Sequence, residues 1–350
     1  MGGAKVLSPG RRYRRRRRLR QTRRGVVAVI GTLLALLVFF ALFGIFLTQY
    51  LPLWMTDNEA EFTSQAATSF ATLKSYVDSQ YLDGGPSAYG VPFTMSSQGV
   101  PLLAQPTGGT LQFIPNSCPG GFWPTTTATH AAGQPEVPSY CIFQNITLST
   151  GPGGSGQYSQ HVATGLLEMS LPNRYYSAQT FYFEDDGVIQ SQGGPQEIML
   201  VPPPFNVTKV GVNTTVTSSF LQLYGNATTV VGQGSQSVFS YLRYSQVVTS
   251  SASTTGTVKP YTVSFEVGTQ NPCAWDRFLW GQMNISGLST SSYNWTSPVT
   301  HTPSGGPGAS LSCSLGNGQT SILAVNINVA VDYSTVFYSG VQISLGVGGT

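Results

Sequence analysis

Val26–Leu47 reads VVAVIGTLLALLVFFALFGIFL, twenty-two residues without a charge, and this stretch decides how the chain is organised. At about 1.5 Å per residue a helix of this length reaches about 33 Å, which is enough to cross the hydrocarbon core of a bilayer. A secretory signal peptide is the alternative, but its apolar region has only about 7–15 residues and ends at small residues. Here the run leads instead to Tyr50 and Trp54, whose rings suit the membrane interface. We therefore expect a retained transmembrane helix over residues 26–47.

A basic tail precedes this helix and predicts its direction. Residues 1–25 contain Lys5 and ten arginines but no carboxylate. Because basic flanks stay on the cytoplasmic side, we expect a single-pass protein of the cell membrane, with a cytoplasmic N-terminus and an extracellular C-terminal domain. The run Arg14–Arg18 would also suit a nucleic-acid patch. Its position beside a spanning helix favours a topology signal that contacts anionic lipid, so we expect membrane lipid as a partner and no nucleic acid.

The chain beyond Leu47 has an extracellular composition. It holds all 14 acidic residues and six of the 17 basic ones, which gives a net charge of −8. All four cysteines lie there: Cys118, Cys141, Cys273 and Cys313. Outside the cell they are expected to form two disulfides, for which three connectivities exist. We favour the pairs that are close in sequence, Cys118–Cys141 and Cys273–Cys313.

An amphipathic helix is expected within the juxtamembrane segment 48–82. Apolar residues recur at steps of three and four: Phe62, Ala66, Phe70, Leu73, Val77 and Tyr81. Thr56 and Glu59 have the spacing of an N-terminal capping box, and Asp83–Pro86 would end the helix. Pro52 is expected to break or kink the path from the transmembrane helix. The apolar stripe would pack on the protein's own sheet or form a seam with a neighbouring copy.

Residues 83–350 predict a mainly β fold, an extracytoplasmic antiparallel β-sandwich. Alternating patterns at 261–267, 325–333 and 341–345 indicate strands, and Asp186-Gly187 indicates a hairpin turn within 181–189. Many short strands with frequent turn residues favour a sandwich. Three prolines at 202–204 suggest a seam near residues 202–206 between two halves of the sheet system.

Polar motifs in this region indicate a modified surface rather than catalysis. Six N-x-S/T sequons predict glycosylation, at Asn145, Asn206, Asn213, Asn226, Asn284 and Asn294. No nucleophile, phosphate-loop or dinucleotide motif is present, and we expect no enzyme activity, catalytic residue or cofactor. The histidines are isolated and no CxxC spacing occurs, so no metal site is expected.

Two local clusters leave alternatives open. The carboxylates of Glu184, Asp185 and Asp186 would suit Ca²⁺ or would form the polar tip of a hairpin. Trp275 and Trp280, close to Cys273, would suit sugar binding if exposed or would anchor the core beside a disulfide.

The segment RRGVVAVIG, residues 23–31, resembles the start of archaeal type IV pilin-like and flagellin-like precursors. In that group a basic leader ends in a small residue, and the apolar helix is retained after cleavage. The resemblance implies processing at Arg24, Gly25 and Val26 by a prepilin-type peptidase, and self-assembly through the N-terminal helix. It predicts a pilin-like surface structural protein and a filament subunit after cleavage following Gly25. A stand-alone membrane-anchored binding or adhesion module is the alternative.

Overall fold

The computed structural model describes residues 29–83, 87–101, 103–118, 140–150, 156–193, 196–211, 213–251, 260–296, 321–328, 331 and 333–347. The chain divides into two compact units, Met1–Asp57 and Asn58–Thr350. The described helices include η1 (Phe46–Tyr50), α2 (Leu51–Asp83), α3 (Pro272–Ile285) and η2 (Thr290–Ser292). The strands are β1 (Ala88–Thr94), β2 (Gly109–Ile114), β3 (Ile142–Thr150), β4 (Gly156–Thr164), β5 (Leu166–Leu171), β6 (Gln179–Glu184), β7 (Gly187–Ser191), β8 (Glu197–Val201), β9 (Phe205–Val210), β10 (Asn213–Tyr224), β11 (Thr228–Gly232), β12 (Ser235–Ser251), β13 (Pro260–Thr269), β14 (Tyr293–Thr296), β15 (Ser321–Ile327) and β16 (Tyr333–Val347).

The N-terminal helix does not stop at Pro52. It is helical over Val29–Leu82, and residues 46–50 form the π-helical turn η1, where the N–H of Leu51 bonds the carbonyl of Phe46. A π-helical turn already shifts the hydrogen-bond pattern of the helix, so the missing N–H of a proline that follows it is tolerated. Of the expected break or kink at Pro52, the break is therefore wrong. Among the described residues one helix, Val29–Leu82, is long and apolar enough to cross a membrane.

The expected capping box is also wrong, because α2 does not begin at Thr56. The Thr56 hydroxyl instead donates to the carbonyl of Pro52 inside the helix, at 2.9 Å. Five residues of the apolar stripe, Phe62, Ala66, Phe70, Leu73 and Val77, are at most 2% exposed, and the sixth, Tyr81, is partly buried. The five buried side chains pack against strands of the same chain, so the stripe belongs to the protein's own core.

The strands form three sheets. Sheet 1 has the order β1-β12-β16-β10-β9, sheet 2 β11-β2-β5-β6-β7-β8, and sheet 3 β14-β15-β13-β3-β4. Among the described strands every pair is antiparallel except β10–β16, which runs parallel from Thr215↔Tyr333 to Tyr224↔Gln342. The expectation of a purely antiparallel system is wrong at this pair. A parallel pair needs a long connection, and more than a hundred residues separate β10 from β16.

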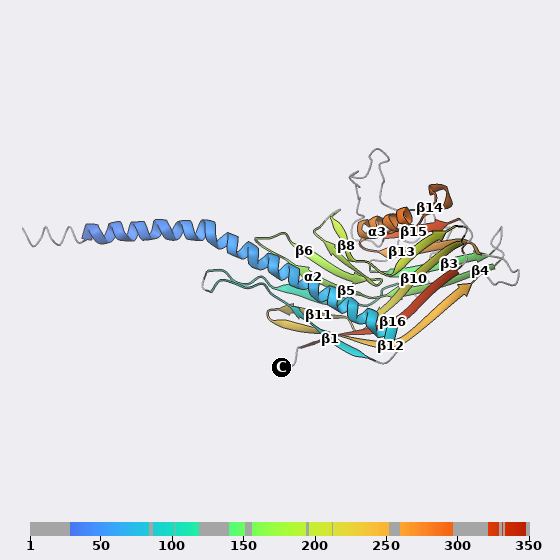
Figure 1. Cartoon of the computed structure of the whole chain (residues 1–350). Coiled ribbons are helices and arrows are strands. Elements are labelled where there is room, and N and C mark those ends of the chain that lie inside the picture. Colours follow the sequence, from blue (N-terminus) through green and yellow to red (C-terminus); the bar gives the residue numbers. More distant parts are fainter. Residues whose placement is uncertain are drawn as a thin grey trace, which may run out of the picture. The chain divides into compact units, whose positions relative to one another are not determined.

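Sheet 1 lies between two hydrophobic cores. In β10, Val216 and Phe220 belong to one core, whereas Leu221 and Leu223 belong to the other. Successive side chains of a strand point to opposite faces, so the even-numbered pair lies on one face of the sheet and the odd-numbered pair lies on the other. The first core contains the stripe of α2 with sheets 1 and 2, and the second contains α3 with sheets 1 and 3. Figure 1 shows α2 running along the strands and α3 beside β13 and β15.

The other strand predictions have mixed outcomes. Residues 261–267 lie in β13 and residues 341–345 in β16, as expected. Of the predicted strand 325–333, residues 325–327 lie in β15, but one continuous strand is wrong, because β15 ends at Ile327 and β16 begins at Tyr333. Prolines 202–204 connect β8 of sheet 2 to β9 of sheet 1. Residues on both sides of this connection belong to the unit Asn58–Thr350.

Candidate functional site

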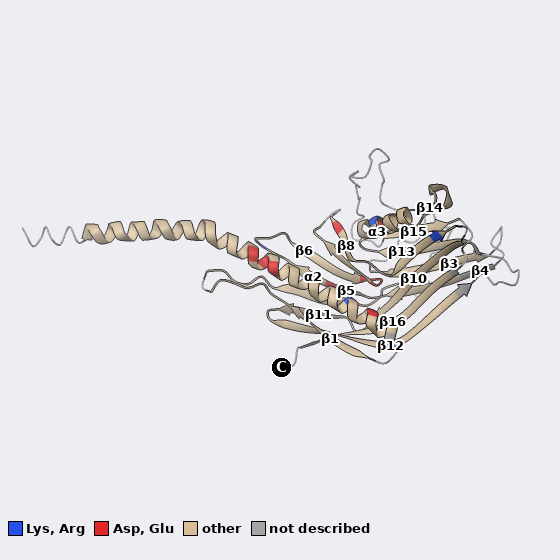
Figure 2. Ribbon diagram, viewed as in Figure 1, with Lys and Arg blue, Asp and Glu red and all other residues tan. Residues whose placement is uncertain are grey.

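The first candidate site is the apolar surface of the N-terminal helix. Every described side chain from residue 29 to residue 43 is exposed, including Leu33, Leu37 and Phe40 at 58–64%. The ribbon carries no charged residue along this stretch (Figure 2). In water such a surface is unfavourable by about 25 cal/mol for each Å². It therefore requires lipid or apolar protein around it.

Residues 1–28, with the basic tail and the expected processing residues Arg24, Gly25 and Val26, lie outside the described part of the chain. Cleavage after Gly25 thus stays a prediction.

The second candidate site is the turn Glu184–Asp186 between β6 and β7, which we call the acidic turn. Glu184 pairs with Gly187, so the two turn residues are Asp185 and Asp186, one position earlier than the sequence indicates. Their φ angles are +48° and +64°, the left-handed conformation of a type I′ hairpin turn, which Asp tolerates better than most residues. All three carboxylates are at most 1% exposed. This hairpin tip is therefore buried inside the protein.

Each residue of the acidic turn contacts a different part of the fold. The hydroxyl of Thr269 on β13 donates to Glu184, and so does the indole N–H of Trp275 on α3, at 3.1 Å. The side-chain amide of Gln144 on β3 donates to the backbone carbonyl of Asp185 at 3.2 Å. The acidic turn thereby joins sheet 2 to sheet 3 and to α3.

Asp186 pairs with a buried lysine of α2. Lys74 Nζ lies 2.9 Å from Asp186 Oδ1 and also contacts the carboxylate of Asp78, one turn further along α2. The side chains of Lys74 and Asp186 are 2% and 0% exposed, whereas that of Asp78 is 31% exposed. Two carboxylates thus share one ammonium group, and one of them reaches solvent.

Burial shifts the titration of this cluster. It raises the pKa of Glu184, although hydrogen bonds from Thr269 and Trp275 act against it, and raises that of Asp185 far above its ordinary value. Burial also raises the pKa of Asp186 to about 6, although the positive charge of Lys74 lowers it. The pKa of Lys74 is raised, because attraction from Asp186 and Asp78 outweighs the cost of burying the ammonium.

The calcium alternative for the acidic turn has no support in the described residues, where no group of three His, Cys, Asp or Glu side chains could hold a metal ion. The ammonium of Lys74 is instead the cation beside Asp186.

Glu59 forms a second buried polar contact of α2. Its carboxylate accepts the hydroxyl of Thr107 at 2.6 Å and the backbone N–H groups of Arg174, Tyr175 and Tyr176 at 2.7–3.1 Å. Burial alone would raise the pKa of Glu59, but these hydrogen bonds outweigh it and lower the pKa. Successive N–H groups of a loop form a concave anion site, and Glu59 is its occupant here. This contact fastens α2 to the β5–β6 loop.

Glu197 on β8 caps the N-terminus of α3. Its Oε2 accepts the N–H groups of Cys273 and Ala274 at 2.9 and 3.3 Å, where a helix attracts negative charge. Burial, the largest influence, still raises the pKa of Glu197 to about 7. Trp275, two residues after Cys273, is fully buried, which confirms the alternative that it anchors the core. Trp280 is 49% exposed.

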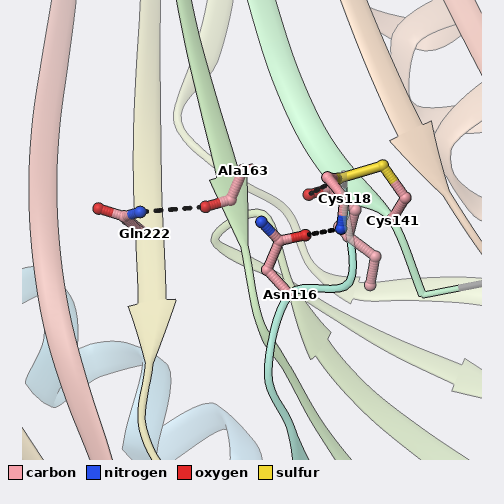
Figure 3. The surroundings of a disulfide bond; sticks show 6 residues. Asn116, Cys118, Cys141, Ala163 and Gln222 are labelled. Atoms are coloured by element: carbon pink, nitrogen blue, oxygen red, sulfur yellow. Dashed lines mark hydrogen bonds between the residues drawn. A yellow bond between two sulfur atoms is a disulfide. The ribbon is translucent and has the colours of Figure 1, made fainter. Parts of the chain in front are cut away.

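The expected bridge Cys118–Cys141 is present, with 4.4 Å between the Cα atoms. Figure 3 shows Asn116 beside it, whose side-chain oxygen accepts the N–H of Cys118 at 2.7 Å. In the same region the amide of Gln222 on β10 donates to the carbonyl of Ala163 on β4 at 3.3 Å, which ties sheet 1 to sheet 3. Cys273 is also disulfide-bonded. The expected pair Cys273–Cys313 stays a prediction, because Cys313 lies outside the described residues.

Five of the six sequons are exposed: Asn206, Asn213, Asn226, Asn284 and Asn294. The sixth sequon differs: Asn145 is 5% exposed and its amide nitrogen donates to Glu266 Oε2 at 2.9 Å, which disfavours the expected glycan there. A glycan at that nitrogen would have to displace a buried hydrogen bond between β3 and β13. Asn206 and Asn294 lie on β9 and β14, which are the edge strands of sheets 1 and 3.

Lys74, Glu59 and Glu197 were not indicated as site residues by the sequence. Lys74 follows Leu73 of the apolar stripe and is one of only six basic residues beyond the tail. A lone lysine beside such a stripe is the one signal that points to a buried ion pair.

Comparisons with protein-family models, with curated proteins and with solved structures found no match for this chain.

Proposed function

We propose that the protein is a pilin-like, membrane-anchored structural protein of the cell surface that becomes a filament subunit after cleavage following Gly25. In this proposal the N-terminal helix holds the precursor in the membrane and later packs against the same helix of other copies. The β-rich region is displayed outside the cell as a glycosylated β-sandwich.

The observation that carries this proposal is the all-round exposure of the apolar helix. Residues 29–43 expose side chains on every face, and not on the single stripe that a helix packed on one sheet would need. Lipid would cover this apolar surface in the precursor, and neighbouring helices would cover it in a filament.

Helix continuity supports the same proposal. A break at Pro52 would separate the anchor from the stripe of α2 that enters the core. Instead the helix is continuous over Val29–Leu82.

The basic tail explains why cleavage must come before assembly. Drawing the helix out of the bilayer with the tail attached would move about ten charges through hydrocarbon, at roughly 2.5–3.5 kcal/mol each on the lenient insertion scale. Once the chain begins at Val26, a single α-amino group at the inner end of the helix replaces the eleven basic side chains of the tail.

Surface glycans fit the low charge of the chain. Figure 2 shows most of the described ribbon without charged residues. Glycans on the five exposed sequons would supply solubility, and those at Asn206 and Asn294 would shield edge strands that otherwise tend to pair with other chains.

A pair of glycine variants tests the proposal. Gly25→Val places a branched side chain at the expected cleavage site and should leave the full-length precursor in the membrane without filaments. Gly31→Val is the matched control, because a Cβ at Gly31 meets nothing within 4 Å, and it should be processed like the wild type.

Two results would contradict the filament. One is processing of Gly25→Val at the wild-type rate, and the other is a wild-type chain that is never processed. Uncleaved wild-type protein at the cell surface would favour the stand-alone anchored binding or adhesion module.

A further inference from the structure

Lys74, Asp186 and Asp78 are arranged as an amine, an acid and a proton acceptor. The amine nitrogen of Lys74 lies 2.9 Å from a carboxylate oxygen of Asp186, which comes from the β6–β7 turn rather than from α2. Asp78 contacts the same nitrogen from the neighbouring turn of α2. The elements that carry the pair also contribute to the first core, through Leu73 and Val77 of α2 and through Phe183 and Val188 beside the turn.

We propose that Lys74 and Asp186 condense to form an intramolecular isopeptide bond, with Asp78 transferring the proton. The product is an amide between Lys74 Nζ and Asp186 Cγ, and it links α2 covalently to the acidic turn. This inference does not depend on the proposed filament function.

The reaction balances without an oxidant, a reductant or a cofactor. The ammonium of Lys74 gives one proton to the carboxylate of Asp186, which produces a neutral amine and a neutral acid. The amine nitrogen attacks Cγ of Asp186, and Asp78 accepts the second proton of the nitrogen. Asp78 then returns this proton to the hydroxyl on Cγ, which leaves as water. One N–C bond forms, one C–O bond breaks, and one water molecule is released.

Burial favours the neutral reactants that this step needs. Separated charges are costly in a low-dielectric interior, so proton transfer within a buried pair costs much less than it does in water. The same burial raises the pKa of Asp186, which increases its protonated fraction. Attraction from Asp186 and Asp78 raises the pKa of Lys74 and keeps the neutral pair a minority. The bond would therefore form slowly and accumulate, because a site closed to water hydrolyses it poorly.

The groups that face the reacting pair come from several elements. Tyr81 on α2 bonds Asp78, and burial is the main reason that its pKa is raised, so it stays a neutral phenol. The carboxyl of Asp185 is adjacent in the turn, and its raised pKa also favours a neutral form. Of Lys74, Asp186 and Asp78, only Asp78 reaches solvent, because its side chain is 31% exposed. Protons and the released water can therefore leave the site past the side chain of Asp78.

Mass spectrometry of the full-length protein tests the bond. Folded protein in detergent is denatured, reduced and digested with a protease that cleaves after aromatic residues and leucine. We expect a branched peptide that joins the segment of Lys74 to the segment of Asp186 and is lighter than the two by one water molecule. Recovery of both segments only as separate, unmodified peptides would overturn the proposal.

Variants separate the chemistry from folding. Lys74→Arg removes the nucleophile and should abolish the branched peptide. Asp78→Asn keeps both reacting groups and should reduce the branched peptide at least tenfold. Formation of the Cys118–Cys141 disulfide, together with protease resistance, shows whether each variant has folded. Branched peptide at the wild-type level in folded Asp78→Asn would refute the role of Asp78.

Discussion

Replacing Glu59 should loosen the contact between α2 and the β5–β6 loop. The carboxylate is fully buried and accepts one hydroxyl and three backbone N–H groups. Glu59→Ala leaves all four donors without this acceptor. Glu59→Gln keeps one oxygen for the N–H groups of the loop, and its new NH₂ group can donate to the hydroxyl of Thr107.

The two substitutions should therefore differ in size. A hydrogen bond to a charged group contributes about 1.5–3 kcal/mol, and a buried donor left without a partner costs about 1–3 kcal/mol. Water reaches part of the loop, because Tyr175 and Tyr176 are 43% and 37% exposed, so the four losses do not add fully. We expect Glu59→Ala to lower the free energy of unfolding by about 3–5 kcal/mol and Glu59→Gln by about 1–3 kcal/mol.

Urea unfolding in detergent, followed by tryptophan fluorescence to which the buried Trp275 contributes, measures the loss. Hydrogen exchange at the amides of Tyr175 and Tyr176 gives a local readout, and both should lose protection in Glu59→Ala. Glu61→Ala is the matched control on the same helix, because Glu61 is exposed and bonds only Gln65 among the contacts described for it. A Glu59→Ala protein that unfolds within about 0.5 kcal/mol of the control, with both amides still protected, would refute the reasoning.

Two further predictions concern pH and glycans. The free energy of unfolding should fall as the pH rises from about 4 to 8, because burial raises the pKa of Glu197 to about 7, so the folded state binds this proton more tightly than the unfolded state does. Glu197 contributes about 3 kcal/mol of this fall, so Glu197→Gln should flatten the pH profile of urea unfolding by that amount. An unchanged profile would contradict the raised pKa of Glu197. Asn206→Gln should remove one glycan from the native protein on a gel. Asn145→Gln should leave the glycan mass unchanged and lower the stability of the protein. Loss of a glycan in Asn145→Gln would instead show that this site is modified before the chain folds.

Periodic features of the fold were predictable from the sequence because they depend on local spacing. The stripe from Phe62 to Val77 follows the helical period, and β13 follows the period of a strand. The Cys118–Cys141 bridge closes a short segment, so proximity in sequence was a sufficient guide.

Non-local pairings were not predictable in this way. Nothing in the residues of β10 specifies that β16 lies beside it in a parallel direction, because the choice depends on how the whole intervening chain folds. The capping box at Thr56 and Glu59 had the right spacing, but tertiary contacts gave Glu59 partners on a distant loop.

The candidate site shows the same limit. Lys74 and Asp186 lie in separate elements, and their contact requires the β6–β7 turn to be buried under α2. The sequon at Asn145 looks like the other five, and only the register Glu266↔Asn145 between β13 and β3 reveals that its amide is used inside the sheet.

The N-terminal sequence of the protein isolated from its native membrane tests the filament proposal most directly. Our account predicts a chain that begins at Val26 and has lost Lys5 and all ten arginines of the tail. A protein that still begins at or near Met1 in surface-assembled material would contradict it.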